Sequence, residues 1–332
     1  MMWYWYRERE EGEICLLRIF GDCSEVVLPD WIEGKPVTQI GDYCFSDRET
    51  CTGREEWLRM AQGDSGTAFS GDPDSFRRAY ESGAMVPLCG GNITRVVLPA
   101  AVRKIGQLCF YQCRNLKELS IGPGECEIGS DAFMNCRKFH KVVLRAKADQ
   151  RTALRQILMQ RTGEMDAWFT NAAIHFPEFS ETYDLIGPAH IFELNIEGEG
   201  FRARQCFEGE VFQFERYDSI FAQARETEPE VTLCKMAAFR LRYPAGLREK
   251  FYRAYAGYLL EHIGAFCDEL IRLKDLTLLE GLGEQGLLGE EQQMICVEKM
   301  LQAKWVQGTR MLLAWKKEWN QKNESGESEE CR

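Results

Sequence analysis

The sequence predicts an α+β fold: an N-terminal solenoid with short parallel strands, followed by a mainly α-helical domain with a small antiparallel β meander. Three observations lead to this prediction. Between residues 96 and 144 apolar residues return every 23 positions, so that Leu98, Ile121 and Leu144 fall in register. After Leu144 this period is lost, and from Tyr217 onward apolar residues have helical spacing. A fixed period in the twenties is typical of stacked coils, each too small to bury its own apolar face.

Other positions of the repeat return in the same register. They are Ile105 with Ile128, Gly106 with Gly129, Phe110 with Phe133, Cys113 with Cys136, and Leu116 with Phe139. The pattern resembles the BspA-like leucine-rich repeat, which is common in bacterial proteins, and the match lies in Ile105, Gly106, Phe110, Cys113, Asn115 and Leu116. This resemblance implies a leucine-rich-repeat solenoid over roughly residues 14–145. It is specific for the fold and says little about function.

A diverged copy of the repeat lies upstream, at residues 25–45. Leu28 and Ile40 are 12 positions apart, against 7 for Leu98 and Ile105, and such extra residues are a variation for which the family is known. We therefore predict a BspA-like leucine-rich-repeat domain over residues 1–145. A strand at 13–20 is predicted to cap the exposed end of the stack, and residues 1–6 to add an edge strand.

Alternate residues of a strand face opposite sides, so we expect Val96 and Leu98 to point inward and Arg95 to point outward. The outward row then contains Glu25, Arg95, Glu118 and Lys141, whose charges alternate in sign. Parallel strands lie about 4.8 Å apart, close enough for such charges to neutralise one another. We interpret this row as a device for solubility and register rather than as a binding patch. The candidate partner-binding residues on the sheet are Val97, Ser120 and Val143.

A glycine-rich insertion, residues 46–92, interrupts the stack, with short helices predicted near 54–61 and 74–82. Insertions between repeats fall on one face, often the face that binds a partner. Arg54, Trp57 and Phe76 are therefore further candidate partner-binding residues, and the alternative is that the insertion has no binding role.

The sequence GDSG at 63–66 matches a serine-protease motif. We interpret it as a turn, because every histidine lies downstream and that chemistry needs a histidine base.

The second domain is predicted to span residues 146–320 and to be mainly helical. Helices are predicted at 148–160 and 166–176, and a β meander at 190–214 with strands at 190–196, 201–207 and 211–214. Further helices are predicted at 217–225, 231–241, 244–259, 264–273, 275–281, 290–303 and 306–319. Leu278 and Leu279 recur 34 positions later as Leu312 and Leu313, which loosely resembles ankyrin helices, although the TPLH signature is missing. Residues 321–332 are predicted to be a disordered acidic tail.

Composition bears on partners and on location. The formal net charge of −11 argues against nucleic-acid binding and against docking on an anionic membrane. No apolar run is long enough to span a bilayer, and the start MMWYWYREREEGE lacks the features of a secretory signal. Several of the 14 cysteines occupy repeat slots, as Cys44 and Cys109 do, so we interpret them as reduced core residues of a cytoplasmic protein. Family members are often exported, which leaves a secreted or surface location as the alternative.

No spacing of His, Cys or acidic residues requires a metal, and we expect no cofactor and no catalytic activity. The glycine-rich segment 281–286 is interpreted as a helix end and turn rather than a nucleotide site. The predicted function is a non-enzymatic protein–protein interaction module with an unidentified protein partner, working as a monomer or weak homo-oligomer. One alternative is an effector or toxin-associated protein that acts through its helical domain. The other is an enzyme with an unrecognised inter-domain site, where His190 and His262 could converge.

Overall fold

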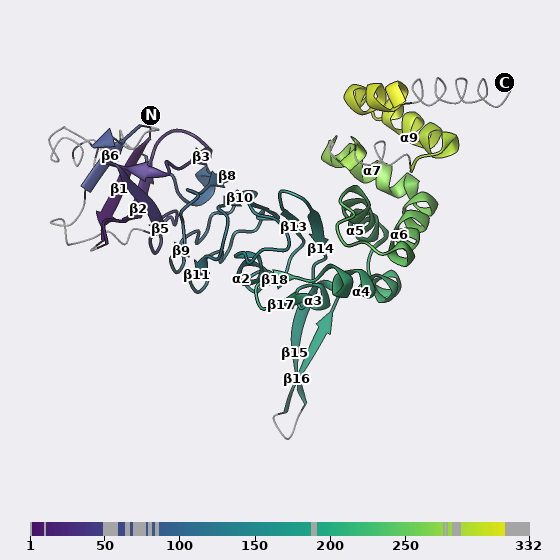
Figure 1. Cartoon of the computed structure of the whole chain (residues 1–332), viewed down its shortest axis with the longest axis horizontal. Helices are drawn as coiled ribbons and strands as arrows, with labels where there is room; N and C mark the ends of the chain where they lie inside the picture. The colour runs from purple at the N-terminus through teal and green to yellow at the C-terminus, as the bar shows by residue number, and fades with distance from the viewer. Residues whose placement is uncertain are drawn as a thin grey trace. The chain divides into compact units, whose positions relative to one another are not determined.

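The computed structural model describes residues 2–9, 11–48, 59–63, 67–68, 78, 82–83, 86–186, 191–274, 276, 278–280 and 287–315 (Figure 1). The chain forms two compact units. The solenoid unit comprises Met1–Thr170 and Phe207–Phe212, and the helical unit comprises Asn171–Cys206 and Gln213–Arg332. The solenoid unit thus extends past the predicted boundary at residue 145.

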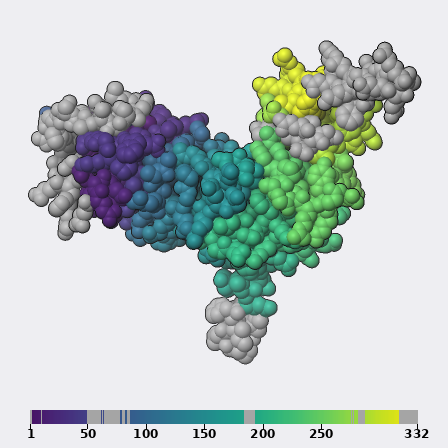
Figure 2. All heavy atoms as spheres, in the orientation of Figure 1, coloured from purple at the N-terminus to yellow at the C-terminus, as the bar shows by residue number. Residues whose placement is uncertain are grey.

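Two sheets form the walls of the solenoid unit. The first is parallel and contains, from one edge, β3 (Glu25–Val27), β8 (Arg95–Val97), β10 (Glu118–Ile121), β12 (Lys141–Leu144) and β13 (Met165–Trp168). The second has the order β11 (Glu127–Ile128), β9 (Lys104–Ile105), β5 (Lys35–Ile40), β2 (Ile14–Phe20), β1 (Trp3–Glu8), β6 (Arg59–Gln62) and β7 (Thr67–Ala68). The short strand β4 (Trp31–Ile32) pairs with β5, and a 3-10 turn, η2 (Gly90–Asn92), precedes β8. Successive coils form successive bands of colour in Figure 2, because residues close in sequence also stack closely in space.

The apolar residues that repeat every 23 positions form continuous buried columns. Val96, Leu119 and Val142 are opposite one another in the strand register and are all fully buried. Leu98, Ile121 and Leu144 are buried at the following inward positions. The predicted solenoid core is therefore confirmed, since each coil covers the apolar face of its neighbour.

A stack of aromatic rings continues the core at the turns between the two sheets. The ring centroids of Phe45 and Phe110 are 4.9 Å apart, and those of Phe110 and Phe133 are 5.5 Å apart. The thiol of Cys113 donates to the carbonyl oxygen of Phe45 at 3.2 Å, and that of Cys136 donates to the carbonyl oxygen of Phe110 at 3.0 Å. Burial raises the pKa of Cys113 well above its usual range, so this thiol stays protonated. All cysteines among the described residues are free.

The repeated glycine is required by the close approach of neighbouring coils. A Cβ atom added at Gly106 would lie 2.4 Å from the backbone nitrogen of Asp42. A Cβ atom added at Gly129, one coil later, would lie equally close to the backbone nitrogen of Gln107. Only a residue without a side chain fits this slot, because backbone of the preceding coil cannot move away as a flexible side chain can.

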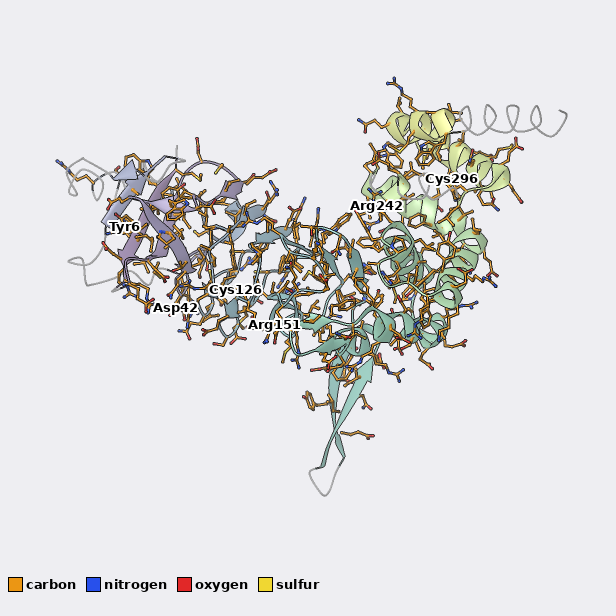
Figure 3. All side chains as sticks on the ribbon, in the orientation of Figure 1. Tyr6, Asp42, Cys126, Arg151, Arg242 and Cys296 are labelled. Carbon is orange, nitrogen blue, oxygen red and sulfur yellow. The ribbon has the colours of Figure 1, made fainter. Side chains whose placement is uncertain are left out.

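The N-terminal strands form part of the second sheet rather than its edge. β1 is antiparallel to both β2 and β6, so the prediction of an edge strand at residues 1–6 is wrong. Tyr6 is fully buried there (Figure 3). Because β6 belongs to the insertion, part of the insertion contributes to the fold. The end of the helix predicted at 54–61 is strand instead, and the rest of that segment lies outside the described residues.

A short helix, α2 (Leu154–Leu158), covers the end of the second sheet at β11, and the chain then returns to the first sheet as β13. The side-chain oxygen of Gln156 accepts the backbone N–H of Ile128 at 3.0 Å, and that of Gln160 accepts the backbone N–H of Ala132 at 2.9 Å. The Gln160 amide nitrogen also donates to the carbonyl of Gly129. These side chains thus occupy hydrogen-bonding positions that backbone would occupy in a further coil.

The helix predicted at 166–176 is wrong. Residues 165–168 are β13, which pairs in parallel with β12 and aligns Asp166 with Lys141. β14 (Ala173–Phe176) follows in the helical unit, with all four residues buried. Both segments are short apolar runs that periodicity cannot assign to helix or strand, and pairing with neighbouring backbone decides the outcome.

The helical unit contains one hairpin and a set of short helices. Its elements are β14, β15 (Ser180–Ile186), β16 (Ile191–Glu197), α3 (Gly200–Ala203), α4 (Phe214–Thr227), α5 (Glu230–Arg242), α6 (Glu249–Glu261), α7 (Ile263–Leu273) and α9 (Glu290–Gln302), and residues 306–315 are also helical. The predicted small antiparallel β structure in this region is confirmed, but the three strands predicted at 190–214 do not form one meander. β16 pairs with β15, residues 200–203 are helical, and β17 (Phe207–Glu208) pairs with β18 (Val211–Phe212) in the solenoid unit. The predicted tail at 321–332 lies outside the described residues.

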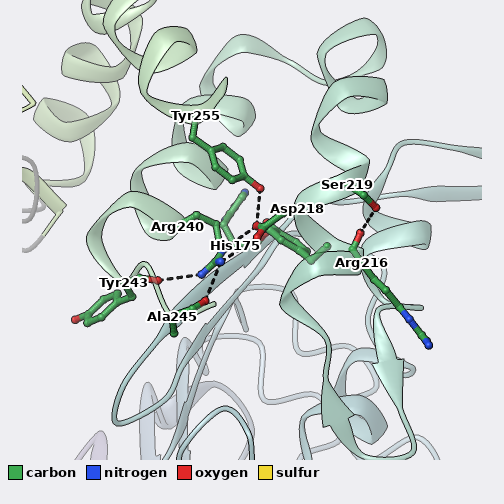
Figure 4. Close-up of polar contacts among 9 residues, drawn as sticks. His175, Arg216, Asp218, Ser219, Arg240, Tyr243, Ala245 and Tyr255 are labelled. Carbon is green, nitrogen blue, oxygen red and sulfur yellow. Dashed lines mark hydrogen bonds and ion pairs between the residues drawn. The ribbon is translucent and has the colours of Figure 1, made fainter. Parts of the chain in front are cut away.

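A buried ionic cluster joins helices α4, α5 and α6 (Figure 4). The guanidinium group of Arg240 donates to both carboxylate oxygens of Asp218, at 2.7 and 3.0 Å. It also donates to the carbonyl oxygens of Tyr243 and Ala245, at 2.9 and 3.0 Å. The hydroxyl of Tyr255 donates to Asp218 at 3.0 Å, and burial raises the pKa of Tyr255 well above its usual range. Since these bonds hold residues 243–245 outside a helix, α6 begins at Glu249 and not at the predicted Pro244.

Candidate functional site: the outer face of the parallel sheet

The outer face of the parallel sheet carries two rows of side chains that run across the strands. The strand register aligns Glu25, Arg95, Glu118, Lys141 and Asp166 in a charged row. Two residues further along each strand, the same register aligns Val27, Val97, Ser120, Val143 and Trp168, which we call the apolar row. Both rows follow from the alternation of side chains along a strand.

The charged row neutralises itself. The guanidinium group of Arg95 is 2.8 Å from a carboxylate oxygen of Glu118 and 3.6 Å from one of Glu25. The ammonium group of Lys141 is 3.0 Å from the other oxygen of Glu118. Burial raises the pKa of Glu118, but the hydrogen bonds from Arg95 and Lys141 outweigh it, and the pKa lies below its ordinary value. The predicted ladder of alternating charges is confirmed, and its carboxylate at Glu118 is engaged on both sides.

The apolar row is accessible along most of its length. Val27 is 54 % exposed, and Val97, Val143 and Trp168 are half-buried. The ammonium group of Lys141 lies 5.3 Å from the ring centroid of Trp168, so the charged row also borders this aromatic side chain. The result is a strip of apolar surface beside a line of paired charges.

The structure separates the candidate partner-binding residues into three groups. Val97 and Val143 lie in the apolar row, on the outer face of the sheet. Ser120 lies between them in register but is only 5 % exposed, because its small side chain is flanked by larger ones, so it offers little contact surface. The candidates in the insertion, Arg54, Trp57 and Phe76, lie outside the described residues.

Two residues of the apolar row were missed by sequence reasoning. Val27 occupies the same repeat slot as Val97 and could have been found by extending the alignment to the upstream copy. Trp168 was missed because residues 166–176 were assigned to a helix, which hides the register with Val143.

The sequence raised two further questions: whether His190 and His262 converge in an enzymatic site, and whether any residues could bind a metal. Nδ1 of His262 donates a hydrogen bond to a carboxylate oxygen of Glu230 at 2.7 Å, and its ring stacks on Tyr258, whereas His190 lies outside the described residues. Within the described ranges, no group of three or more His, Cys, Asp or Glu residues is arranged to hold a metal ion. The helices that the structure describes are all too short or too polar to cross a membrane. The absence of catalytic activity remains a prediction.

Comparison with known families agrees with the coil geometry. A family model described as "BspA type Leucine rich repeat region (6 copies)" matches residues 88–153. Comparisons with curated proteins and with solved structures found no match. The matched residues include β8 to β12 and end just before α2, and this is where the columns and rows described above are most regular. Residues 88–153 of this chain are therefore a BspA-type leucine-rich repeat region.

Proposed function

We propose that this protein is a non-enzymatic interaction module that binds a protein partner through the apolar row of its parallel sheet. The observation that carries the proposal is a row of accessible valine and tryptophan side chains, held at strand spacing by the repeat. Leucine-rich repeats commonly serve as protein-interaction modules, and a partner strand or helix laid along the row would cover these side chains together.

The ion pairs within the charged row favour the apolar row, and not the charged row, as the binding surface. Because Arg95 and Lys141 already engage Glu118, a partner that used these charges would first have to separate them. An exposed ion pair contributes only about 0–1 kcal/mol, so the row adds little binding energy of its own. It keeps an otherwise apolar sheet face in solution, and the apolar row supplies the buried contact area.

The test is an affinity pulldown from native lysate with the full chain as bait. A variant with Val97→Glu and Val143→Glu places charges in the centre of the apolar row. Matched control baits carry Met134→Glu or Met159→Glu, which alter exposed apolar side chains of the same unit away from the sheet. We expect partners that the wild-type and control baits recover equally and that the double variant loses by about tenfold or more.

Equal recovery by the wild type and the double variant would refute the proposal. A further bait with Arg54→Ala, Trp57→Ala and Phe76→Ala tests the insertion as the recognition element. Substitutions are preferable to deletion here, because deleting residues 50–88 would remove β6, which pairs with β1. Loss of partners from this bait alone would place recognition in the insertion instead of the sheet.

A further inference from the structure

The hairpin formed by β15 and β16 is a two-stranded ribbon whose two faces differ in chemistry. It projects from the rest of the helical unit (Figure 1). Seven residue pairs are in register, from Ser180 opposite Glu197 to Ile186 opposite Ile191. Cross-strand partners lie on the same face, so Tyr183 and Leu194 share a face with Ile196 and with Glu181, the partner of Ile196. Among the described residues, no third strand joins this sheet.

Backbone and side-chain contacts hold the two ends of the hairpin together at its base. A Cβ atom added at Gly200 would lie 2.2 Å from the carbonyl oxygen of Pro177, so the two ends of the hairpin meet backbone to backbone. The buried guanidinium group of Arg204 donates to that same carbonyl at 2.6 Å and lies 5.0 Å from the ring centroid of Phe179. Phe179 also packs edge-on against Phe201 at 5.6 Å. These contacts order the base of the ribbon in advance of binding, and such pre-ordering lowers the entropy cost of binding.

The apolar face of the ribbon is exposed to solvent. Tyr183 is 65 % exposed, and Leu194, directly opposite it, is 46 % exposed. Ile196, the next residue on this face, is 37 % exposed. An isolated two-stranded hairpin is marginal in water, and an apolar cross-strand pair on it stabilises the ribbon only modestly. Glu181 lies opposite Ile196, so the exposed apolar side chains of this face lie toward the β16 edge, with Tyr183 beside Leu194. Neighbouring exposed apolar side chains of this kind mark an interaction surface.

The charge of the hairpin has one sign. Residues 178–200 contain no Lys or Arg and six acidic residues: Glu178, Glu181, Asp184, Glu193, Glu197 and Glu199. The face opposite Tyr183 and Leu194 carries the exposed carboxylates of Glu193 and Glu197, which alternate with the apolar residues along β16. A strand that extends this ribbon at the β16 edge would therefore meet Leu194 and Ile196 on one face and the carboxylates of Glu193 and Glu197 on the other.

We propose that the hairpin is a docking arm for a partner protein, which adds a strand of alternating apolar and Lys or Arg residues to its edge. The apolar side chains of that strand extend the face of Tyr183 and Leu194, and its cations face Glu193 and Glu197. The open ribbon edge supplies the backbone hydrogen bonds, as in other strand-addition complexes. This surface belongs to the helical unit and is independent of the apolar row of the solenoid.

A second copy of this chain is the less suitable occupant. Pairing two such hairpins would bring together twelve acidic residues, six from each copy, without a single cation between them. Like charges directly opposite each other in a sheet are destabilising. A basic strand, in contrast, gains from both faces of the ribbon.

The test uses the full chain and fluorescein-labelled peptides in fluorescence polarisation. The probe is an eight-residue peptide that alternates Val and Lys. One control peptide alternates Val and Glu, and another has the composition of the probe with all Lys in one block. We expect the alternating Val–Lys peptide to bind at least about tenfold more tightly than either control, with affinity falling as salt is added. Equal binding of the alternating and block peptides would overturn the proposal, because net charge alone would then explain it.

Variants locate the binding site. Tyr183→Ser with Leu194→Ser leaves every charge in place and should weaken binding of the Val–Lys peptide by about tenfold. The matched control, Leu273→Ser, changes an exposed apolar residue elsewhere in the helical unit and should bind as the wild type does. Glu193→Lys with Glu197→Lys should reverse the peptide preference, so that the Val–Glu peptide binds better than the Val–Lys peptide. This variant also tests the proposal if the serine variant does not fold. Unchanged preference would overturn the proposal. So would a concentration-dependent dimer in sedimentation velocity that the serine variant abolishes, since the occupant would then be a second copy.

Discussion

The repeated coils of the solenoid unit keep their charged side chains on the surface, whereas the helices of the helical unit also bury a pair of charges. Between β8 and β12 the inward side chains are apolar residues and thiols, and the charges of Arg95, Glu118 and Lys141 lie on the outer face. The helical unit instead buries the carboxylate of Asp218 and the guanidinium of Arg240 completely. The comparison shows that the coils are held by many similar apolar contacts, whereas helices α4, α5 and α6 are joined by a few specific polar contacts around Asp218 and Arg240.

This difference has an energetic consequence. Taking a carboxylate and a guanidinium out of water carries a large desolvation cost, which the mutual attraction and additional hydrogen bonds offset only if all partners are present. In the solenoid, loss of one coil contact leaves the neighbouring contacts intact, since interactions extend only to adjacent coils. The predictions below test this contrast, in order of decreasing effect.

The largest effect is expected for Asp218→Ala. It leaves the fully buried guanidinium of Arg240 without its carboxylate, which should lower the free energy of unfolding by about 3–5 kcal/mol. The control, Glu215→Ala in the same helix, breaks an exposed ion pair with Arg248 and should cost about 0–1 kcal/mol. Urea unfolding followed by far-UV circular dichroism measures both values. Similar losses for the two variants would contradict the distinction between buried and exposed charge.

A smaller effect is expected for Leu119→Ala in the solenoid column. The variant leaves a cavity at a fully buried position and should lower the free energy of unfolding by about 2–5 kcal/mol. Val97→Ala, on the outer face of the neighbouring strand, should cost about 1 kcal/mol or less, because Val97 is only half-buried. Denaturant unfolding of the two variants provides the comparison. If Val97→Ala were the more damaging substitution, the assignment of inward and outward positions would be untenable.

Reversal of charge at Arg95 tests the charged row. Arg95→Glu places a carboxylate between Glu25 and Glu118 and should lower stability by about 1 kcal/mol at low salt. The loss should shrink as salt screens the repulsion. Arg137→Glu alters an exposed residue outside the row and should change stability by no more than about 0.5 kcal/mol. Thermal melts at low and high ionic strength measure these differences, and an unchanged melting temperature for Arg95→Glu would remove the stabilising role of the row.

The smallest effect concerns pH. The pKa of Glu118 in the folded protein is lowered by hydrogen bonds from Arg95 and Lys141, which outweigh the opposing effect of burial. A carboxyl with a lowered folded pKa adds stability above its unfolded pKa, about 4.3, and this stability is lost as pH falls through the folded value. Glu118→Gln should therefore be less stable than the wild type at about pH 7, and the difference should shrink as the pH falls below the unfolded pKa and through the lower folded pKa. Unfolding curves at neutral pH and at a series of acidic pH values test this, and a constant difference would show that ionisation of Glu118 is not the cause.

Predictions from the sequence were accurate where a structural element repeats. The columns through Leu98, Ile121 and Leu144, and the alternating charges of the outer row, were predicted from spacing alone. Each coil packs on a coil of nearly the same sequence, so the same position meets the same surroundings every time. The same alternation brought Val97 and Val143 to the outer face, whereas Ser120, also a candidate, is only 5 % exposed.

Predictions failed where a segment lies next to backbone that is distant in sequence. Residues 166–168 became a strand because β12 offered an unpaired edge, and residues 200–203 became a helical turn where Gly200 meets Pro177. Trp168 was lost from the predicted site as a consequence. The hairpin partner of β16 was also missed, because β15 had no assigned structure in the sequence prediction.

The sequence by itself determined the stacked coils, their inward apolar columns and the sign of each charge in the outer row. These features follow from local periodicity, because every coil repeats the same burial pattern and interacts with its immediate neighbours. Only the tertiary structure decided that Asp218 would pair with Arg240 across two helices, that β13 would extend the parallel sheet, and that Tyr183 would lie opposite Leu194 on an exposed ribbon. Such pairings depend on which distant backbone and side chains are brought within hydrogen-bonding distance, and no periodic pattern in the chain records that information.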